Sequence, residues 1–333
     1  MTGHATWTTR LSFLLAAVGA AVGLGNIWKF PYMTGTNGGA AFVTVYLICV
    51  VAIAIPILIA ELMLGRRGRA SPPTAVRQVA LESGCSPRWG LIGWLGAGAG
   101  FLIVSFYSVI AGWALQYTLA APLGRLQGLD AAGSAALFEG LLASPGVLTF
   151  WHTAFMATTV VIVARGLNRG IESAVRILMP ALFVMLLVMV IYAAAAGDFA
   201  RAWTFLFRFE AGAVDGAVVL EAIGQAFFSI GVSMGLMMMY GAYLPAREPI
   251  PRYSVIIAVA DTLVALLAGL AIFPLVFAHG LDPAEGPGLI FVTLPIAFGN
   301  MPFGAAFGGV FFLLLVFAAI TSAIALLQPM VAP

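Results

Sequence analysis

Eight long apolar segments dominate the sequence and restrict the chain to a membrane-embedded fold. A helix needs about 20 apolar residues to cross the hydrocarbon core of a bilayer. Polar connections separate the segments, and the longer ones cover about 65–88, 121–147, 197–215 and 280–302. We therefore predict an all-α polytopic membrane protein with eight spans. These spans are about 10–34, 39–64, 89–120, 148–165, 174–196, 216–241, 252–279 and 303–331.

The composition excludes an ordinary soluble protein. Only 8% of the 333 residues are charged and 62% are hydrophobic, whereas soluble domains carry roughly 25% charged residues. The net charge is +2, and the sequence has no basic run interleaved with aromatic residues, so we expect no nucleic-acid partner. Cys49 lies in an apolar segment and Cys85 in a polar loop, so we expect two free thiols.

Basic residues are distributed unevenly between the two sides of the predicted spans. Cytoplasmic loops carry the excess of lysine and arginine. With the N-terminus inside, eleven of the 15 basic residues fall on the inner side and four on the outer side. We therefore predict a multi-pass protein of the plasma (inner) membrane with a cytoplasmic N-terminus. The inner group is Arg10, Arg66, Arg67, Arg69, Arg77, Arg88, Arg165, Arg169, Arg176, Arg247 and Arg252, and the outer group is Lys29, Arg125, Arg201 and Arg208.

Glycine-rich sequences occur near the middle of the first and sixth spans. Residues 19–26 read GAAVGLGN and residues 228–235 read FSIGVSMG. Each glycine costs a helix about 1 kcal/mol relative to alanine, and unwound backbone at membrane depth survives only beside polar groups. Close packing of helices through small residues is the alternative interpretation. Interrupted helices at corresponding places of two halves favour a transporter site.

The spacing of these two breaks suggests a five-helix unit repeated in inverted form. Spans 1–5, about 10–196, form the first repeat, and spans 6–8, about 216–331, form part of the second. We treat residues 1–333 as a single transmembrane transporter domain.

The motifs along the chain resemble those of the neurotransmitter:sodium symporter family, in its prokaryotic amino-acid-transporting branch. The resemblance starts with Trp7 and Arg10, continues through the string AVGLGNIWKFP at 21–31, and extends in order along essentially the whole chain. Further matching positions are 37–42, Pro56, Glu61, Gly65, Arg66, Arg165, Gly166, 170–172, Met179, Pro180, 224–229, 321–325, Gln328 and Pro329.

This resemblance implies a transporter and no enzyme. The function that it implies is sodium-coupled symport of a neutral hydrophobic or aromatic amino acid into the cell by alternating access. The family has eleven or twelve spans on a core of two inverted five-helix repeats, with helices 1 and 6 broken. Because eight spans are present, we expect the chain to be C-terminally incomplete. The expected partners are the amino-acid substrate and the lipid bilayer, with no obligate protein partner evident.

The resemblance also implies two sodium sites. The first would use the carbonyl of Ala21 with Asn26, Ser229, Asp261 and the substrate carboxylate. Asn26 has an ordinary alternative as a hydrogen bonder between helices. The second would use the carbonyls of Gly19, Val22 and Ala318 with the hydroxyls of Thr321 and Ser322. Hydroxyls in helices often bond the carbonyl four residues earlier instead.

The substrate pocket implied by position surrounds the two breaks. Tyr107 would bind the substrate carboxylate and form a lid with Phe228. Gly231 and the flexible Met234 leave room for a large apolar side chain. The implied lining residues are Ala21, Gly23, Leu24, Gly25, Ile103, Tyr107, Phe228, Ser229, Gly231, Met234, Ser322 and Leu326.

Asp261 is the most informative single residue, because an aspartate at the centre of a span costs about 2.5–3.5 kcal/mol and is usually functional. The family commonly has asparagine here. Its eukaryotic members bind chloride at positions matching Tyr46, Gln225 and Ser229, and an ionised Asp261 would supply that negative charge. We therefore expect no chloride requirement. A protonated Asp261 that hydrogen-bonds a neighbour, or that takes part in proton coupling, is the alternative.

Glu61 lies near the inner end of the second span. The resemblance implies that it braces the unwound backbone of helix 6, with snorkelling toward Arg66 as the alternative.

Two rival functions have little support in the sequence. A membrane enzyme is the first, but the sequence has no H-E-x-x-H motif and no complete dinucleotide fingerprint. A channel is the second. Channels generally build carbonyl-lined pores by symmetry, in contrast to two unlike broken helices in one chain.

Overall fold

The structure, a computed structural model, describes residues 6–209 and 211–331 and is helical throughout, with no strand in those ranges. The α-helices are α1 (Arg10–Ala21), α2 (Phe30–Thr36), α3 (Ala40–Cys49), α4 (Ile55–Gly68), α5 (Pro72–Glu82), α6 (Leu91–Ala120), α7 (Ala131–Leu142), α8 (Pro145–Ala164), α9 (Ser173–Ala196), α10 (Phe199–Phe207), α11 (Gly216–Ile230), α12 (Leu236–Ala242), α13 (Ile250–Ala278), α14 (Leu294–Asn300) and α15 (Gly304–Val331). Turns of π-helix are η1 (Gly25–Lys29), η2 (Val50–Ala54), η4 (Leu167–Glu172) and η6 (Leu289–Thr293), and 3₁₀ turns are η3 (Pro87–Gly90) and η5 (Ala211–Ala213).

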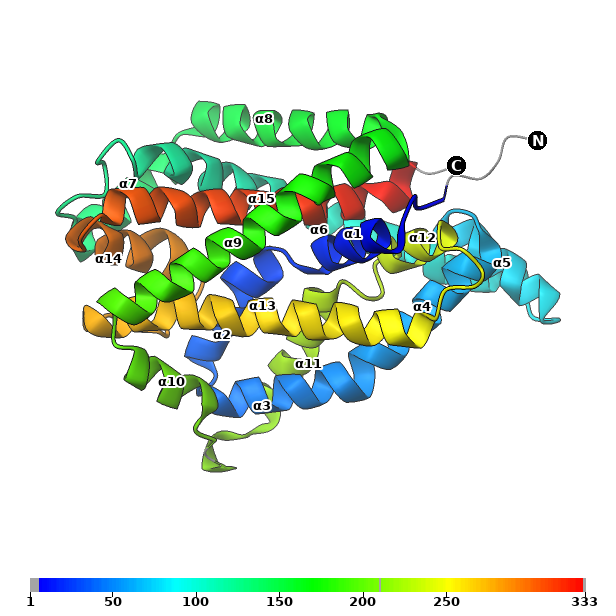
Figure 1. Ribbon diagram of the computed structural model, residues 1–333, viewed down its shortest axis with the longest axis horizontal. Coiled ribbons are helices and arrows are strands. Elements are labelled where there is room, and N and C mark those ends of the chain that lie inside the picture. Colours follow the sequence, from blue (N-terminus) through cyan, green and yellow to red (C-terminus); the bar gives the residue numbers. More distant parts are fainter. Residues whose placement is uncertain (1–5, 210, 332–333) are drawn as a thin grey trace.

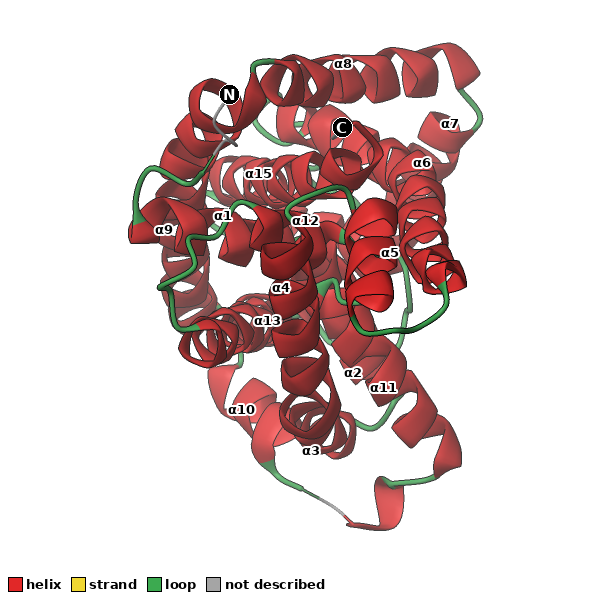
Figure 2. Cartoon of the chain, turned by 90° about the vertical axis from the view of Figure 1, so that its right-hand side faces the viewer, coloured by secondary structure: helices red, strands yellow, loops and turns green. Residues whose placement is uncertain are grey.

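The long helices run side by side, and α1 and α12, one part of each broken span, lie in the middle of the bundle (Figures 1 and 2). All seven residues of α12 are buried, as is most of the second half of α1. The apolar window of α15 is 78% buried, whereas that of α8 is 11% buried. Therefore α15 is a central helix, and α8 exposes most of its surface to the surroundings.

The two predicted breaks are confirmed. In span 1, α1 ends at Ala21 because Val22 takes an extended backbone conformation, and the helices before and after the break are bent by 46°. In span 6, α11 ends at Ile230 and α12 begins at Leu236. Gly231 and Gly235 both have a positive φ, at 72° and 78°, which glycine adopts without the steric cost of a Cβ atom.

The predicted number of eight spans is not confirmed. By length and composition, six continuous helices are able to cross a membrane, and the bent pair at Arg10–Thr36 makes up to seven within the described ranges. The sixth predicted span fails this test because its break leaves helices of 15 and 7 residues. The continuous helices are Ala40–Gly68, Pro87–Ala120, Pro145–Ala164, Leu167–Ala196, Ile250–Ala278 and Gly304–Val331.

The long connections, expected to be polar loops, contain further helices. They hold α5, α7 and α10, and the turn η6 that leads into α14. In α5 the residues Ala75, Val76 and Ala80 are buried while Arg77 and Gln78 are exposed, so this short helix packs one side against the bundle. Two of the other segments, Ala131–Leu142 and Leu289–Asn300, are apolar but much shorter than the roughly 20 residues that a span needs.

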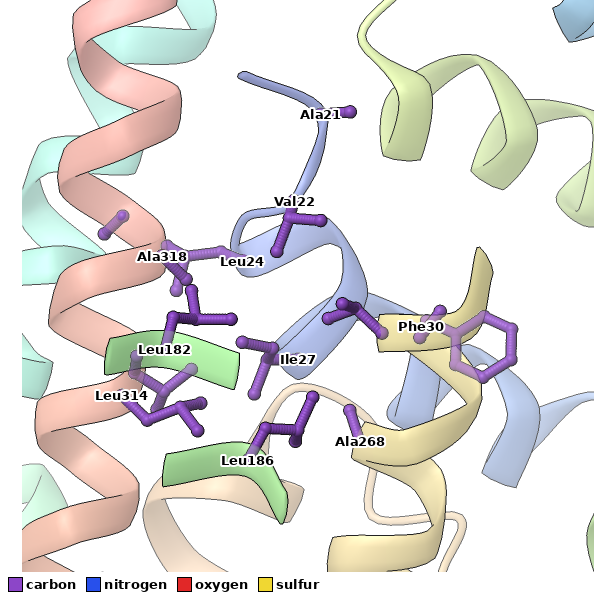
Figure 3. Close-up of a cluster of buried hydrophobic side chains, with 14 of the residues drawn as sticks. Ala21, Val22, Leu24, Ile27, Phe30, Leu182, Leu186, Ala268, Leu314 and Ala318 are labelled. Atoms are coloured by element: carbon purple, nitrogen blue, oxygen red, sulfur yellow. The ribbon is translucent and has the colours of Figure 1, made fainter. Parts of the chain in front are cut away.

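Span 1 is fixed in the bundle by a buried apolar cluster (Figure 3). Val22, Leu24 and Ile27 come from the break and the turn after it, and they meet side chains of α9, α13 and α15. Ile27 is fully buried and Leu24 is 1% exposed. The side chains of the break therefore anchor it in the core, which leaves its peptide groups free to point at polar partners. The partner side chains labelled in Figure 3 are Leu182, Leu186, Ala268, Leu314 and Ala318.

Candidate functional site

Side chains from other spans bond peptide groups at the break in span 1 and in the turn after it. The amide of Leu24 donates to the hydroxyl of Tyr107 at 3.0 Å. The carbonyl of Val22 accepts from Ser322 at 3.1 Å, and the carbonyl of Gly25 accepts from Gln225 at 2.8 Å. Because buried peptide groups need partners, the break is built into the fold by residues of α6, α11 and α15.

A carboxylate holds the break in span 6. The amide of Ser233, whose φ is 70°, donates to Oε1 of Glu61, a residue that is 5% exposed. Arg66 instead donates to the carbonyl of Glu248 at 2.7 Å. The expected brace between Glu61 and helix 6 is therefore confirmed, and the snorkelling alternative is not observed.

Four buried polar residues, named here the Asp261 cluster, lie between the two breaks. They are Asn26, Tyr46, Ser229 and Asp261, and each is at most 1% exposed. The side-chain nitrogen Nδ2 of Asn26 donates to Oδ1 of Asp261 at 2.7 Å and to Oγ of Ser229 at 3.0 Å. Ser229 donates to Oδ2 of Asp261 at 2.7 Å, and the hydroxyl of Tyr46 lies 3.5 Å from the same oxygen. The structure thus brings together three of the four protein ligands implied for the first sodium site.

The fourth ligand implied for the first sodium site, Ala21, is the last residue of α1. It lies directly before the break, where helix carbonyls lack intrahelical partners. Two further oxygen atoms near the cluster, Oε1 of Gln225 and Oγ1 of Thr262, are buried without a hydrogen-bond partner in the described ranges. Such orphaned acceptors are costly in a protein interior.

The residues implied for the second sodium site come from α1 and α15, which pack against each other. Ser322 reaches the Val22 carbonyl, and a Cβ atom on Gly19 would lie 3.3 Å from Cβ of Thr321. The Thr321 hydroxyl donates to the carbonyls of Ala318 at 3.0 Å and Phe317 at 3.2 Å. Thr321 therefore bonds within its own helix, whereas Ser322 bonds across to the break.

The oxygen atoms available at the residues implied for the two sodium sites suit a hard monovalent cation. They are carbonyl, hydroxyl, amide and carboxylate oxygens, which hard cations prefer. Within the described ranges, no three His, Cys, Asp or Glu residues gather in a way that would hold a softer metal. Because Asp261 is the one carboxylate in the cluster, the set carries at most a single negative charge, which a single sodium ion balances.

A small cavity of about 30 Å³ lies beside the Asp261 cluster. Such a volume admits about one or two water molecules, so an amino acid would enter only if the lining opens. Ten of the twelve predicted substrate residues line the cavity, together with Ala20 and Leu236, which the sequence did not indicate. Of the other two, Leu24 belongs to the apolar cluster and Ser229 to the Asp261 cluster. The predicted residues that line it are Ala21, Gly23, Gly25, Ile103, Tyr107, Phe228, Gly231, Met234, Ser322 and Leu326.

Two glycines allow span 1 to approach the cavity walls closely. A Cβ atom on Gly23 would lie 2.7 Å from the Tyr107 hydroxyl, and one on Gly25 would lie 3.2 Å from the ring of Phe228. Phe228 is also covered on one face, because the Lys29 ammonium lies 4.6 Å from its ring centroid, a favourable cation–π distance. The ring of Phe228 therefore separates Lys29 from the cavity.

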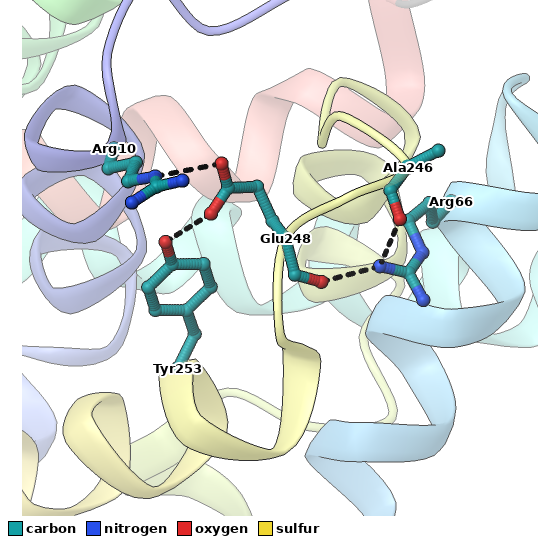
Figure 4. A network of polar contacts seen from close by, with 5 residues as sticks. All are labelled: Arg10, Arg66, Ala246, Glu248 and Tyr253. Carbon is teal, nitrogen blue, oxygen red and sulfur yellow. Dashed lines mark hydrogen bonds and ion pairs between the residues drawn. The ribbon is translucent and has the colours of Figure 1, made fainter.

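Polar contacts join the N-terminal end of span 1 to the connection between α12 and α13 (Figure 4). Arg10 pairs with Glu248 at 2.9 Å, and Tyr253 donates to the second oxygen of the same carboxylate. Trp7 donates from its ring nitrogen to the carbonyl of Tyr240 at 3.2 Å. The hydrogen bond from Tyr253, followed by that from Arg10, lowers the pKa of Glu248 below its ordinary value of 4.5.

Protonating Glu248 is expected to weaken this network. A carboxyl whose folded pKa is depressed stabilises the fold above its unfolded pKa, and that contribution is lost as the pH falls through the folded pKa. At pH 7 we expect Glu248→Gln to unfold at a lower temperature than the wild type, and the difference to shrink as the pH falls below 4.5. Thermal unfolding followed from neutral to acidic pH measures both results.

Glu82→Gln is the matched control for Glu248→Gln. Glu82 pairs with Arg67 at 2.9 Å, but both side chains are more than half exposed, at 55% and 58%. Exposed pairs contribute little because solvent screens them. An equal loss of stability in the two variants at pH 7 would show that the Glu248 network has no special role.

Comparison with known proteins gives the family. Residues 4–127 and 136–333 match the profile of the sodium:neurotransmitter symporter family. The chain is 40% identical over 326 residues to an uncharacterized sodium-dependent transporter, YhdH, of Bacillus subtilis (strain 168), covering 98% of this chain and 71% of that one. The sodium-dependent neutral amino acid transporter B(0)AT3 of Mus musculus is 27% identical over 303 residues, covering 80% and 47%.

A solved relative has the same fold. The crystal structure of MhsT in complex with L-phenylalanine matches with a TM-score of 0.89 and 44% sequence identity, and it covers 98% of this chain and 73% of that one. The relatives named above as sodium-dependent are transporters and not enzymes, and the long apolar helices agree with a multi-pass membrane protein. The chain therefore belongs to the sodium:neurotransmitter symporter family and is a sodium-dependent transporter.

Proposed function

We propose that the chain carries out sodium-coupled symport of a neutral hydrophobic or aromatic amino acid into the cell by alternating access. The observation that carries this proposal is the position of the Asp261 cluster, buried between two broken spans and next to a cavity with an apolar lining. An amino acid and a cation are both charged, and unwound peptide groups are able to bind them without many charged side chains in lipid.

In the proposed mechanism, the first sodium ion binds at Asp261, Asn26, Ser229 and the carbonyl of Ala21. The carboxylate of Asp261 supplies the negative charge, so no chloride is required. The second ion binds between α1 and α15, at the carbonyls of Gly19, Val22 and Ala318 and the hydroxyls of Thr321 and Ser322. To bind this ion, the Thr321 hydroxyl gives up its hydrogen bonds to the carbonyls of Phe317 and Ala318.

The amide of Leu24 and the hydroxyl of Tyr107 are the groups proposed to hold the substrate carboxylate. They are 3.0 Å apart and bonded to each other, so substrate binding replaces this bond with contacts to the substrate. The cavity wall offers Ile103, Phe228 and Met234 to the substrate side chain, and no charged residue of the described ranges lines it. This lining supports an apolar substrate, as does the complex of the related MhsT with L-phenylalanine.

Contacts at the two ends of span 1 are proposed to close the site on the two sides of the membrane. With the N-terminus in the cytoplasm, the network of Trp7, Arg10 and Glu248 closes the cytoplasmic side. Phe228, with Lys29 beyond it, closes the outer side. Alternating access then requires these two sets of contacts to break in turn.

Uptake into proteoliposomes tests the proposed function. An inward sodium gradient is expected to drive accumulation of labelled L-phenylalanine, and unlabelled leucine is expected to compete while lysine and glutamate are not. The same vesicles with potassium in place of sodium serve as the control. Equal uptake in the two salts would refute sodium coupling, and competition by lysine equal to that by leucine would refute the apolar substrate.

Gly231→Ser is expected to change substrate preference. A Cβ atom there would lie 3.1 Å from Cδ2 of Leu236, so the serine side chain narrows the cavity where the sequence predicts room for a large substrate. We expect the ratio of phenylalanine to alanine affinity to fall about tenfold, consistent with about 1–3 kcal/mol for a tightened apolar pocket. Competition binding with both amino acids measures this ratio.

Gly84→Ser is the matched control for Gly231→Ser. Gly84 has a nearly equal φ of 71°, but a Cβ atom on it meets nothing within 4 Å. It therefore reproduces the backbone strain of about 1–2 kcal/mol without narrowing the cavity. If Gly231→Ser leaves the affinity ratio unchanged, or if Gly84→Ser alters it equally, the assignment of Gly231 to the substrate pocket is wrong.

A further inference from the structure

Two arginines line a groove that the proposed transport cycle does not use. The groove lies between α5 and the start of α6, which pack against each other (Figure 2), and has a volume of about 640 Å³. Arg77, Gln78 and Thr74 come from α5, and Arg88 comes from the turn η3 before α6. The groove is therefore lined by two arginines from different elements.

Neither arginine forms an ion pair in the part of the chain that the structure describes. Within residues 6–209 and 211–331, the ion pairs are Arg10 with Glu248 and Arg67 with Glu82. Glu82, the acidic residue of α5, is thus already paired with Arg67. Guanidinium groups bind phosphate oxygens through paired hydrogen bonds, so Arg77 and Arg88 together suit a phosphate-bearing ligand.

The groove continues into a second, apolar one of about 400 Å³ along α6. The two share Pro73, Thr74 and Trp94, and the second extends past Gly98 to Phe101 and Met330. A Cβ atom on Gly98 would meet nothing within 4 Å, so this glycine leaves the groove open. A cationic space joined to a long apolar one suits a ligand with an anionic head and a hydrocarbon tail.

The surrounding side chains place this pair of grooves at a membrane interface. Trp89 and Trp94 are 55% and 68% exposed, and Leu91, Leu95 and Phe101 beyond them are each at least 60% exposed. Exposed tryptophans are typical of the interface, and a following exposed apolar stretch is typical of the lipid-facing surface. Arg77 and Arg88 thus lie at headgroup level, on the proposed cytoplasmic side.

We propose that these joined grooves bind one phospholipid of the cytoplasmic leaflet with an anionic headgroup. Arg77 and Arg88 hold the phosphate, and one acyl chain lies along Gly98 and Phe101. An anionic headgroup is favoured over a zwitterionic one because a choline or ethanolamine cation would be repelled by the two arginines. The inference rests on the proposed orientation and is independent of which amino acid is transported.

Native mass spectrometry of the purified chain in detergent tests the proposal. We expect one dioleoyl phosphatidylglycerol to be retained about tenfold more tightly than dioleoyl phosphatidylcholine, and millimolar inorganic phosphate not to displace it. Arg77→Gln combined with Arg88→Gln is expected to weaken the retained phosphatidylglycerol at least tenfold, since each basic residue near an anionic surface contributes about fivefold in affinity. Arg169→Gln combined with Arg176→Gln, two exposed arginines of the same proposed side, is the matched control.

A second variant tests the apolar groove with both arginines intact. Gly98→Phe is expected to weaken phosphatidylglycerol retention about tenfold, whereas Gly146→Phe, at another exposed glycine with open space around it, is expected to leave it unchanged. Thermal unfolding confirms that each variant is folded. Equal retention of the two lipids, equal loss in the control variants, or full displacement by inorganic phosphate with no effect of Gly98→Phe would each overturn the proposal.

Discussion

Replacing Asp261 with alanine is expected to lower the apparent sodium affinity by at least about a hundredfold and to abolish sodium-driven uptake. Two opposite unit charges about 4 Å apart attract by about 4 kcal/mol at an effective dielectric constant of about 20. That attraction corresponds to roughly a thousandfold in affinity. The variant also removes the carboxylate that accepts hydrogen bonds from Asn26 and Ser229. Each donor lies 2.7 Å from one of the two carboxylate oxygens. Sodium titration of L-phenylalanine binding measures the effect.

Two further variants separate the charge of Asp261 from its hydrogen bonds. Asp261→Asn keeps a similar shape and is expected to retain binding at a lower sodium affinity that chloride partly restores. Asp130→Ala removes an exposed aspartate that caps α7 by accepting from the Gly133 amide, and it is expected to leave the sodium dependence unchanged. Unaltered sodium affinity in Asp261→Ala, or an equal loss in Asp130→Ala, would show that Asp261 is not a sodium ligand.

Gly23→Ala is expected to reduce L-phenylalanine affinity by about a hundredfold. The added Cβ atom would lie closest to Oγ of Ser322 and 2.7 Å from the Tyr107 hydroxyl, and both neighbours are buried. Overpacking a tight core costs about 1–3 kcal/mol. Here the shift also separates Tyr107 from the Leu24 amide, which is the proposed carboxylate site. Equilibrium binding in saturating sodium measures the loss.

Gly224→Ala is the matched control for Gly23→Ala. Gly224 lies on α11 less than two turns before the second break, and a Cβ atom on it meets nothing within 4 Å. It therefore makes the same chemical change in the other broken span without a clash. We expect its affinity for L-phenylalanine to stay within about twofold of the wild type. An unchanged affinity in Gly23→Ala would contradict the close approach of span 1 to Tyr107.

The parts of the site that the sequence predicted are those that carry an unusual residue for a membrane helix. Glycine at 23, 25, 231 and 235 marks the breaks because glycine destabilises a regular helix relative to alanine. Asp261 marks the cluster because a carboxylate in lipid needs partners. Their placement next to Asn26 and Ser229 required the resemblance to the family, since no local pattern relates spans 1, 6 and 7.

Other features depend on three-dimensional packing and were missed. Leu236 lines the cavity because the positive φ values at Gly231, Ser233 and Gly235 decide which way α12 starts, and hydrophobic periodicity carries no such information. The hydroxyl of Thr321 bonds its own helix while that of adjacent Ser322 crosses to Val22. This difference follows from the rotation of α15 against α1, which the sequence does not specify.

The most direct measurement for the central claim is equilibrium binding of labelled L-phenylalanine to the purified chain in three salts. If the two unwound segments bind sodium and an amino acid side by side, with Asp261 providing the anion, binding occurs equally in sodium chloride and sodium gluconate and is absent in potassium chloride. Equal binding in potassium chloride would contradict the account.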